Sequence, residues 1–146
     1  MNFLRFISVT SALILMITHA DAATLQASTS PAILGEYHSQ IWSGGTVLSG
    51  TTRLRQDASG ISGDYSMNEE KGVTLGQLHE CHAQTAHRWS CLWSDPYGVG
   101  VLIMTFSADF ASFDGYWNSS QSVSDQHGMR WDGQRVQMTK PDTITP

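Results

Sequence analysis

Short runs of β-branched and aromatic residues recur at regular intervals from Ile33 to Gln137, separated by residues that favour turns. The separators at 57–60, 68–72 and 95–98 are rich in Gly, Asp, Asn, Ser and Pro. This spacing is typical of antiparallel strands joined by tight turns, and no segment carries a long apolar stripe of helical period. We predict strands at 33–42, 46–56, 61–67, 73–81, 87–94, 98–107, 112–118 and 129–138.

A degenerate repeat, glycine followed two residues later by an aromatic residue, runs through these strands. It occurs at Gly35 and Tyr37, at Gly63 and Tyr65, and at Gly115 and Trp117, with a reversed echo at Trp131 and Gly133. Glycines inside strands permit sharp coiling and let large rings lie against bare backbone. The repeat therefore predicts an all-β fold: an antiparallel up-and-down meander that closes into a barrel of about eight strands.

The first 22 residues differ in kind from the rest of the chain. Arg5 precedes an apolar run from 6 to 17, and the small residues Ala20 and Ala22 flank Asp21 in the pattern that signal peptidases cleave. We expect a signal peptide at 1–22, cleaved near Ala22, and a single barrel domain at 23–146 with its core at about 33–138. The expected location is secreted or periplasmic. The first cysteine is Cys81, so a lipid anchor is not expected.

Cys81 and Cys91 are the only cysteines. In an exported chain they are expected to pair, and their placement about Ala86 suits a disulfide across a hairpin. The loop is short, so the bond should contribute somewhat under ~3 kcal/mol.

A metal site is the alternative use of this region, because His79, His82 and His87 lie near the cysteines. Side chains alternate between the two faces of a strand, which would place His79 and Cys81 on one face and Glu80 and His82 on the other. We therefore expect no bound metal and no cofactor. A hydrolytic or metal-dependent enzyme that uses the region from His79 to His87 remains an alternative.

No catalytic residue is expected, because the sequence contains neither a Gly-x-Ser-x-Gly elbow nor a His-Glu-x-x-His motif. Asp95, Asp109, Asp114 and Asp132 fall near predicted turns, where we expect solvated side chains. The protein is therefore predicted not to be an enzyme.

The balance of charge limits the possible partners. Thirteen acidic residues outnumber eight basic ones, for a net charge of −5, and the arginines are scattered. Nucleic acid requires a clustered basic face, and a membrane surface favours a basic amphipathic helix. Neither pattern occurs, so we expect no nucleic acid, no membrane span, and as partner an unidentified small ligand or protein.

Five tryptophans, at 42, 89, 93, 117 and 131, are many for one small domain. Most should fill the core, but the mouth of a small barrel is a favoured ligand site, and rings there would suit a flat or sugar-like molecule. We expect a non-catalytic binding domain with Trp93, Trp117 and Trp131 as candidate ligand contacts.

Two resemblances follow from these motifs. The glycine and aromatic repeats, with the segments 107–117 and 131–135, resemble uncharacterised exported bacterial β-meander proteins, which implies architecture and no particular activity. The segments 35–39, 61–65 and 89–97 are remotely similar to the avidin and streptavidin family of biotin-binding barrels. That similarity implies a ligand contact at Ser39, a ureido-oxygen donor at Tyr65 and a packing ring at Trp93. Met67 stands where that family has a serine, and its late acidic residue has no clear match.

The strand from 99 to 106 is apolar at odd and even positions alike. One of its two sets, either Val99, Val101 and Ile103 or Leu102, Met104 and Phe106, must point outward. We expect this face to be covered by a second copy, which makes a homo-oligomer and an assembly role a further alternative. The intramolecular alternative is a cover formed by 23–32 or by the tail after Gln137.

Overall fold

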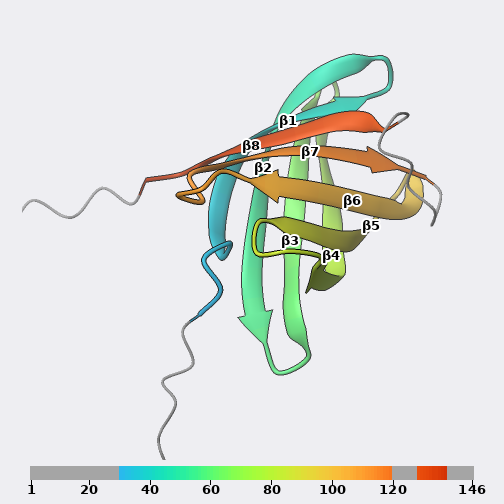
Figure 1. Ribbon diagram of the computed structural model, residues 1–146. Coiled ribbons are helices and arrows are strands. Elements are labelled where there is room, and N and C mark those ends of the chain that lie inside the picture. The colour runs from blue at the N-terminus through green and yellow to red at the C-terminus, as the bar shows by residue number, and fades with distance from the viewer. Residues whose placement is uncertain (1–29, 120–127, 138–146) are drawn as a thin grey trace, which may run out of the picture.

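The computed structural model describes residues 30–119 and 128–137, in which eight antiparallel strands form one closed barrel. Each strand pairs with the next along the chain, and β8 pairs with β1 to close the barrel (Figure 1). The predicted fold is confirmed, and each predicted strand end lies within three residues of the observed one. The expected signal peptide lies outside the described residues. The strands are β1 (Gly35–Ser43), β2 (Thr46–Asp57), β3 (Gly60–Glu69), β4 (Gly72–Ala83), β5 (Arg88–Asp95), β6 (Gly98–Phe106), β7 (Ser112–Asn118) and β8 (Met129–Arg135).

The strands alternate between the barrel interior and the solvent, as a closed sheet requires. On β1, Tyr37, Ser39 and Ile41 are buried while the residues between them are exposed. Gly63 shows why the repeat requires glycine, because a Cβ atom there would lie 2.2 Å from the carbonyl oxygen of Arg53. Only a residue without a side chain lets β2 and β3 approach so closely.

One end of the barrel is closed by packed aromatic rings. We call it the closed end; it contains the start of β1, the hairpin tips 57–60, 83–88 and 106–112, and the end of β8. The Tyr37 ring meets those of Phe106 and Phe113 edge-on, with centroids 5.8 and 5.3 Å apart. Ile33, which precedes β1, is 1% exposed beside this cluster. This packing leaves the opposite end as the place where the interior can be reached.

Arg135, the last residue of β8, joins the two ends of the described chain at the closed end. Its guanidinium donates hydrogen bonds to the carbonyl oxygens of Ala32, Leu34 and Phe110 at 2.5 to 2.9 Å. It also donates to the Tyr37 hydroxyl at 2.5 Å and lies over that ring, 4.8 Å from its centroid. Residues 32–34, which directly precede β1, are thus fixed to the last strand.

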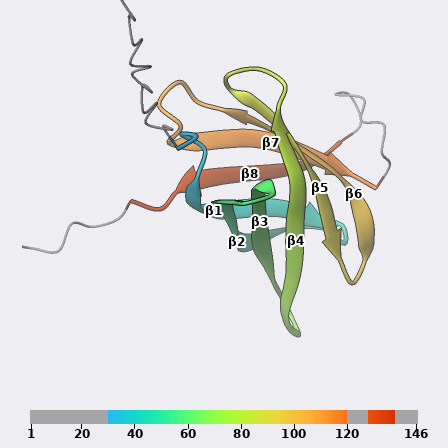
Figure 2. The same cartoon turned by 90° about the horizontal axis from the view of Figure 1, so that it is seen from below.

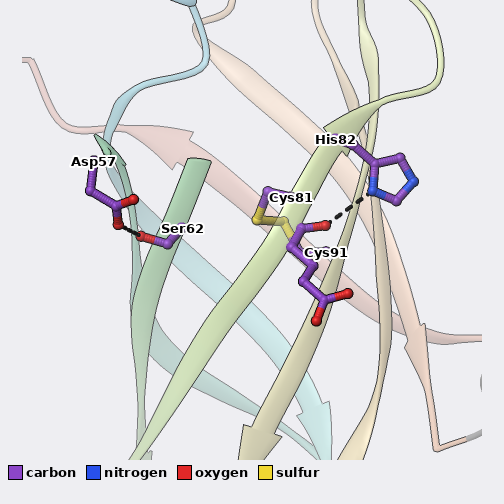
Figure 3. The surroundings of a disulfide bond; sticks show 6 residues. Asp57, Ser62, Cys81, His82 and Cys91 are labelled. Atoms are coloured by element: carbon purple, nitrogen blue, oxygen red, sulfur yellow. Dashed lines mark hydrogen bonds between the residues drawn. A yellow bond between two sulfur atoms is a disulfide. The ribbon is translucent and has the colours of Figure 1, made fainter. Parts of the chain in front are cut away.

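The hairpin of β4 and β5 carries the expected disulfide, between Cys81 and Cys91 (Figure 3). The assumed alternation along β4 is wrong, however. Two residues of β4, Glu80 and Cys81, lie opposite one residue of β5, and Glu80 takes the left-handed conformation with φ of 51°. This bulge shifts the side-chain pattern by one residue. Cys81 therefore points into the barrel while His79 points out, so these two do not share a face.

The inward set of β6 is Leu102, Met104 and Phe106, each no more than 4% exposed. In the outward set, Val101 and Ile103 are also buried, at 7% and 4%, whereas Val99 is 62% exposed. Two of the three outward side chains are therefore already covered in the single chain. Self-association through this strand stays a prediction, without the exposed row that motivated it.

The described residues form no helix, and so none that is long and apolar enough to cross a bilayer. The hairpins project from the barrel to different extents (Figure 2). The tips 43–46, 69–72 and 95–98 all belong to the end opposite the closed one, which we call the open end.

Candidate ligand site at the open end of the barrel

A hollow leads from the open end into the barrel. It holds about 280 Å³ of space free of atoms when the part open to solvent is included. The room for the centres of water molecules is about 30 Å³, which corresponds to about two waters. Its walls are mainly apolar and aromatic, and they consist of Ile41, Ser43, Tyr65, Met67, Trp93, Asp95, Tyr97, Trp117 and Trp131.

Two perpendicular pairs of rings form the aromatic part of the wall. Tyr65 meets Trp131 with centroids 4.6 Å apart, and Trp93 meets Trp117 with centroids 5.1 Å apart. Such edge-to-face contacts stabilise each pair beyond the burial of its area. The Trp93 indole N–H also donates to the Asn118 carbonyl oxygen at 3.2 Å. The rings from β3, β5, β7 and β8 therefore hold one another in place.

The other two indoles are fixed by hydrogen bonds as well. The Trp131 N–H donates to the Thr52 hydroxyl oxygen at 3.0 Å, deep in the barrel. The Trp117 N–H donates to the Trp42 carbonyl oxygen at 3.0 Å, near the end of β1. With these donors used inside the protein, the indoles offer a ligand their aromatic surface.

Asp95 is the charged group in the hollow, and two hydrogen bonds fix its carboxylate. The Tyr65 hydroxyl donates to Oδ2 at 2.8 Å, and the Tyr97 backbone N–H donates to Oδ1 at 2.8 Å. Burial raises the pKa of Tyr65, and the hydrogen bond and charge of Asp95 raise it further. Tyr65 therefore stays protonated and keeps donating to Asp95 throughout the physiological range.

The position of Tyr65 depends on a glycine on the next strand. Gly76 on β4 lies directly against the Tyr65 ring, where an added Cβ atom would be 2.1 Å from Cζ. Tyr65 itself is 2% exposed. The missing side chain at Gly76 thus makes room for the ring that orients Asp95.

The rim of the hollow is held by hydrogen bonds between two hairpins. The Tyr97 hydroxyl lies 2.9 and 3.0 Å from the two carboxylate oxygens of Glu69, and the Thr74 hydroxyl donates to Glu69 at 2.8 Å. Tyr97 thereby connects Glu69 to Asp95. A shallower groove adjoins the hollow and shares Ser43, Tyr97 and Trp117 with it. The groove is lined by Ser43, Gly44, Thr46, Leu48, Glu69, Glu70, Tyr97 and Trp117.

Four of the five candidate ligand residues, Tyr65, Trp93, Trp117 and Trp131, line the hollow. Ser39 does not. It is 1% exposed, and its hydroxyl pairs with that of Thr52 at 2.7 Å. The ligand contacts implied by the avidin resemblance are thus separated here, with Tyr65 bonded to Asp95 and Ser39 bonded below the hollow.

Sequence reasoning missed Asp95 and Tyr97. A solvated side chain was expected for Asp95 near a predicted turn, and no role was assigned to Tyr97. A signal for Asp95 was present. It follows Trp93 by two residues on the same strand, so both side chains point to the same face. Ser43 follows the buried Ile41 by two residues in the same way.

The histidines near the cysteines do not come together. His79 lies on the outer surface beside Leu92 and Val99, the His82 ring nitrogen is 3.0 Å from the Glu80 carbonyl oxygen, and the His87 ring stacks on Phe110 at the closed end. Within 30–119 and 128–137, no three His, Cys, Asp or Glu side chains gather as metal ligands.

No protein-family model, curated protein or solved structure matches the chain, so its function is inferred from the geometry of the open end.

Proposed function

We propose that the protein is a non-catalytic binding barrel that holds a small ligand at its open end. The observation that supports this most directly is the fixed carboxylate of Asp95 inside an aromatic wall. Small-molecule sites are typically apolar hollows with a few well-placed polar groups, already formed before the ligand arrives. The hollow has this composition, and hydrogen bonds hold both its rings and its carboxylate.

The size of the hollow limits what can enter it. Room for about two waters suits a small head group and is less than a fused bicyclic ring such as that of biotin requires. The adjoining groove offers about 510 Å³ to the centres of water molecules and is open to solvent. We therefore propose that a head group enters the hollow while the rest of the ligand lies in the groove.

We propose that this binding takes place outside the cytoplasm. The N-terminal residues 1–22 have the pattern of a signal peptide, and the Cys81–Cys91 disulfide suits an oxidising compartment. Measuring the mass of the mature protein from its own source tests the export step. A mature N-terminus near Ala23 would support it, and an intact Met1 would contradict it.

The proposed site is tested by native mass spectrometry of the purified protein, followed by a thermal-shift screen of anionic, neutral and cationic metabolites. Ser43 lines both the hollow and the groove, so Ser43→Phe should fill the entrance. Ser49→Phe on the exposed outer face of β2 is the matched control. We expect a ligand bound one to one by the wild type and by Ser49→Phe, and lost from Ser43→Phe. Absence of any retained or stabilising ligand, or equal binding by Ser43→Phe, would overturn the proposal.

A further inference from the structure

We infer that the ligand of the open end carries an aliphatic ammonium group, which pairs with Asp95 in the hollow. This inference rests on the proposed binding function and names the chemistry that the site selects. Three features carry it: the unused capacity of the Asp95 carboxylate, the rings around it, and the charge of the hairpin tips.

The Asp95 carboxylate has hydrogen-bonding capacity left. An ionised carboxylate offers about four acceptor positions. The Tyr65 hydroxyl and the Tyr97 backbone N–H occupy one each. The ion pairs found in the described residues belong to Arg53, Arg55 and Arg130, and none includes Asp95. A ligand ammonium group would supply both the N–H donors and the positive charge that Asp95 lacks among the described residues.

The surroundings of Asp95 also favour a positive charge. The rings of Trp93, Trp117 and Tyr97 share the hollow with it. Aromatic faces attract ammonium groups electrostatically, and the attraction strengthens when water is excluded. A primary or methylated ammonium is also small enough for space that holds about two waters, whereas a sugar ring is not.

Acidic residues extend this preference from the hollow to the groove. The hairpin tips 43–46, 69–72 and 95–98 contain three carboxylates, Glu69, Glu70 and Asp95, and a single lysine, Lys71. Asp95 lies in the hollow and Glu69 in the adjoining groove. Both carboxylates accept hydrogen bonds from Tyr97, which connects them. The site would repel anions, attract cations from solution, and bind a second ammonium beside Glu69.

The test compares four-carbon compounds that differ mainly in charge: 1,4-diaminobutane, 1,4-butanediol and succinate, with n-butylammonium as the single cation. Isothermal titration should show one-to-one binding of 1,4-diaminobutane that weakens as salt is added, weaker binding of n-butylammonium, and no binding of butanediol or succinate. An exposed lysine side chain presents the same alkylammonium. A blocked Gly-Lys-Gly peptide therefore forms a further arm, and tighter binding of the peptide than of n-butylammonium would identify a protein as the source.

Variants assign the effect to the two carboxylates. Asp95→Asn keeps the shape of the side chain and should weaken both amines about tenfold or more, which corresponds to about 1.4 kcal/mol. Glu69→Gln should weaken 1,4-diaminobutane more than n-butylammonium. Asp114→Asn, an equal loss of charge on the exposed face of β7, should leave both affinities within about twofold.

The possible failures are distinguishable. If butanediol or succinate binds as tightly as the diamine and Ser43→Phe abolishes that binding, the inference fails while the proposed function stands. The same holds if the ligand retained from the natural source lacks an ammonium group. If no compound binds and no ligand is retained, both are rejected. If Asp95→Asn does not fold, the charge series on the wild type together with Glu69→Gln still decides the outcome.

Discussion

At the scale of single residues, Tyr65 connects the stability of the barrel to its open end. Its ring fills the space above Gly76 and packs against Trp131, and its hydroxyl donates a hydrogen bond to Asp95. Replacement of Tyr65 should alter the protein even in the absence of ligand.

Tyr65→Phe is expected to lower the free energy of unfolding at pH 7 by about 1.5 kcal/mol, because a hydrogen bond to a charged group is lost while partly exposed Asp95 regains water. Tyr97→Phe removes a hydroxyl from a residue that is 66% exposed and should cost under ~0.5 kcal/mol. Urea titrations of both variants measure the difference. Equal losses would contradict the role assigned to the Tyr65 hydroxyl.

Alkaline pH should destabilise the wild type through the same residue. Burial raises the pKa of Tyr65 in the folded protein above its ordinary value of 10.0, and burial also raises that of Tyr37. The unfolded chain therefore loses these protons first. Stability should be unaffected by these groups below about pH 10 and should fall above it, by up to ~1.4 kcal/mol per pH unit for each tyrosine. In Tyr65→Phe the slope should shrink by one tyrosine's share, and an unchanged slope would refute the assignment.

At the scale of the element, the strand ends of the β4–β5 hairpin could be predicted from the sequence, and its bulge could not. The strand ends followed from local turn chemistry, which depends on a few adjacent residues. The bulge at Glu80 had no such marker, because glycine or asparagine is the usual residue in the left-handed conformation. One unpredicted residue was enough to place Cys81 on the face opposite His79, where a shared face was expected.

The sequence likewise predicted only part of the site at the open end. Aromatic residues on strands, such as Trp93 and Trp117, were identified because barrel mouths commonly carry them. Asp95 was missed, because its importance depends on Tyr65, which is thirty residues away in sequence. Contacts between distant strands are set by register and closure of the whole barrel, which local patterns do not specify.

Replacement of both Cys81 and Cys91 by Ala should lower the free energy of unfolding by about 2–3 kcal/mol, because the unfolded chain regains the freedom of its ten-residue loop. Denaturant titration measures the loss. Wild-type protein unfolded and refolded under reducing conditions should then match the variant to within the small difference between a thiol and a methyl group. A variant as stable as the oxidised wild type would show that the disulfide does not stabilise the folded barrel.

At the scale of the whole molecule, the barrel has one end built for stability and one that is accessible. Arg135 and the aromatic cluster around Tyr37 fill the closed end, while Asp95 and the indoles surround a small hollow at the other. Substitutions at the closed end should therefore change stability without changing the contacts available to a ligand.

Arg135→Met keeps an unbranched apolar stem and removes the donors to three carbonyl oxygens and to the Tyr37 hydroxyl. We expect a loss of about 2–4 kcal/mol, because partly buried acceptors lose their partners. Arg130→Met on the same strand is the control; its side chain is 67% exposed, and the loss of its ion pair with Asp132 should cost under ~1 kcal/mol. Thermal unfolding compares them, and similar stabilities would contradict the role of Arg135.

The pairing of the first strand with the last also bears on how quickly the protein folds. Every other pairing joins consecutive strands, which can form as hairpins soon after their turns do. The contact of Arg135 with Tyr37 spans 98 residues, so the loss of chain entropy for closing the ring comes late and in one step. The Val136 N–H donates to the Glu36 carbonyl oxygen at 2.8 Å, which holds the residue after β8 beside the start of β1. A chain joined between β8 and β1 and opened at another hairpin would make the pairing of β1 with β8 local and the pairing at the opened hairpin long-range, and should therefore fold at a similar rate into the same barrel.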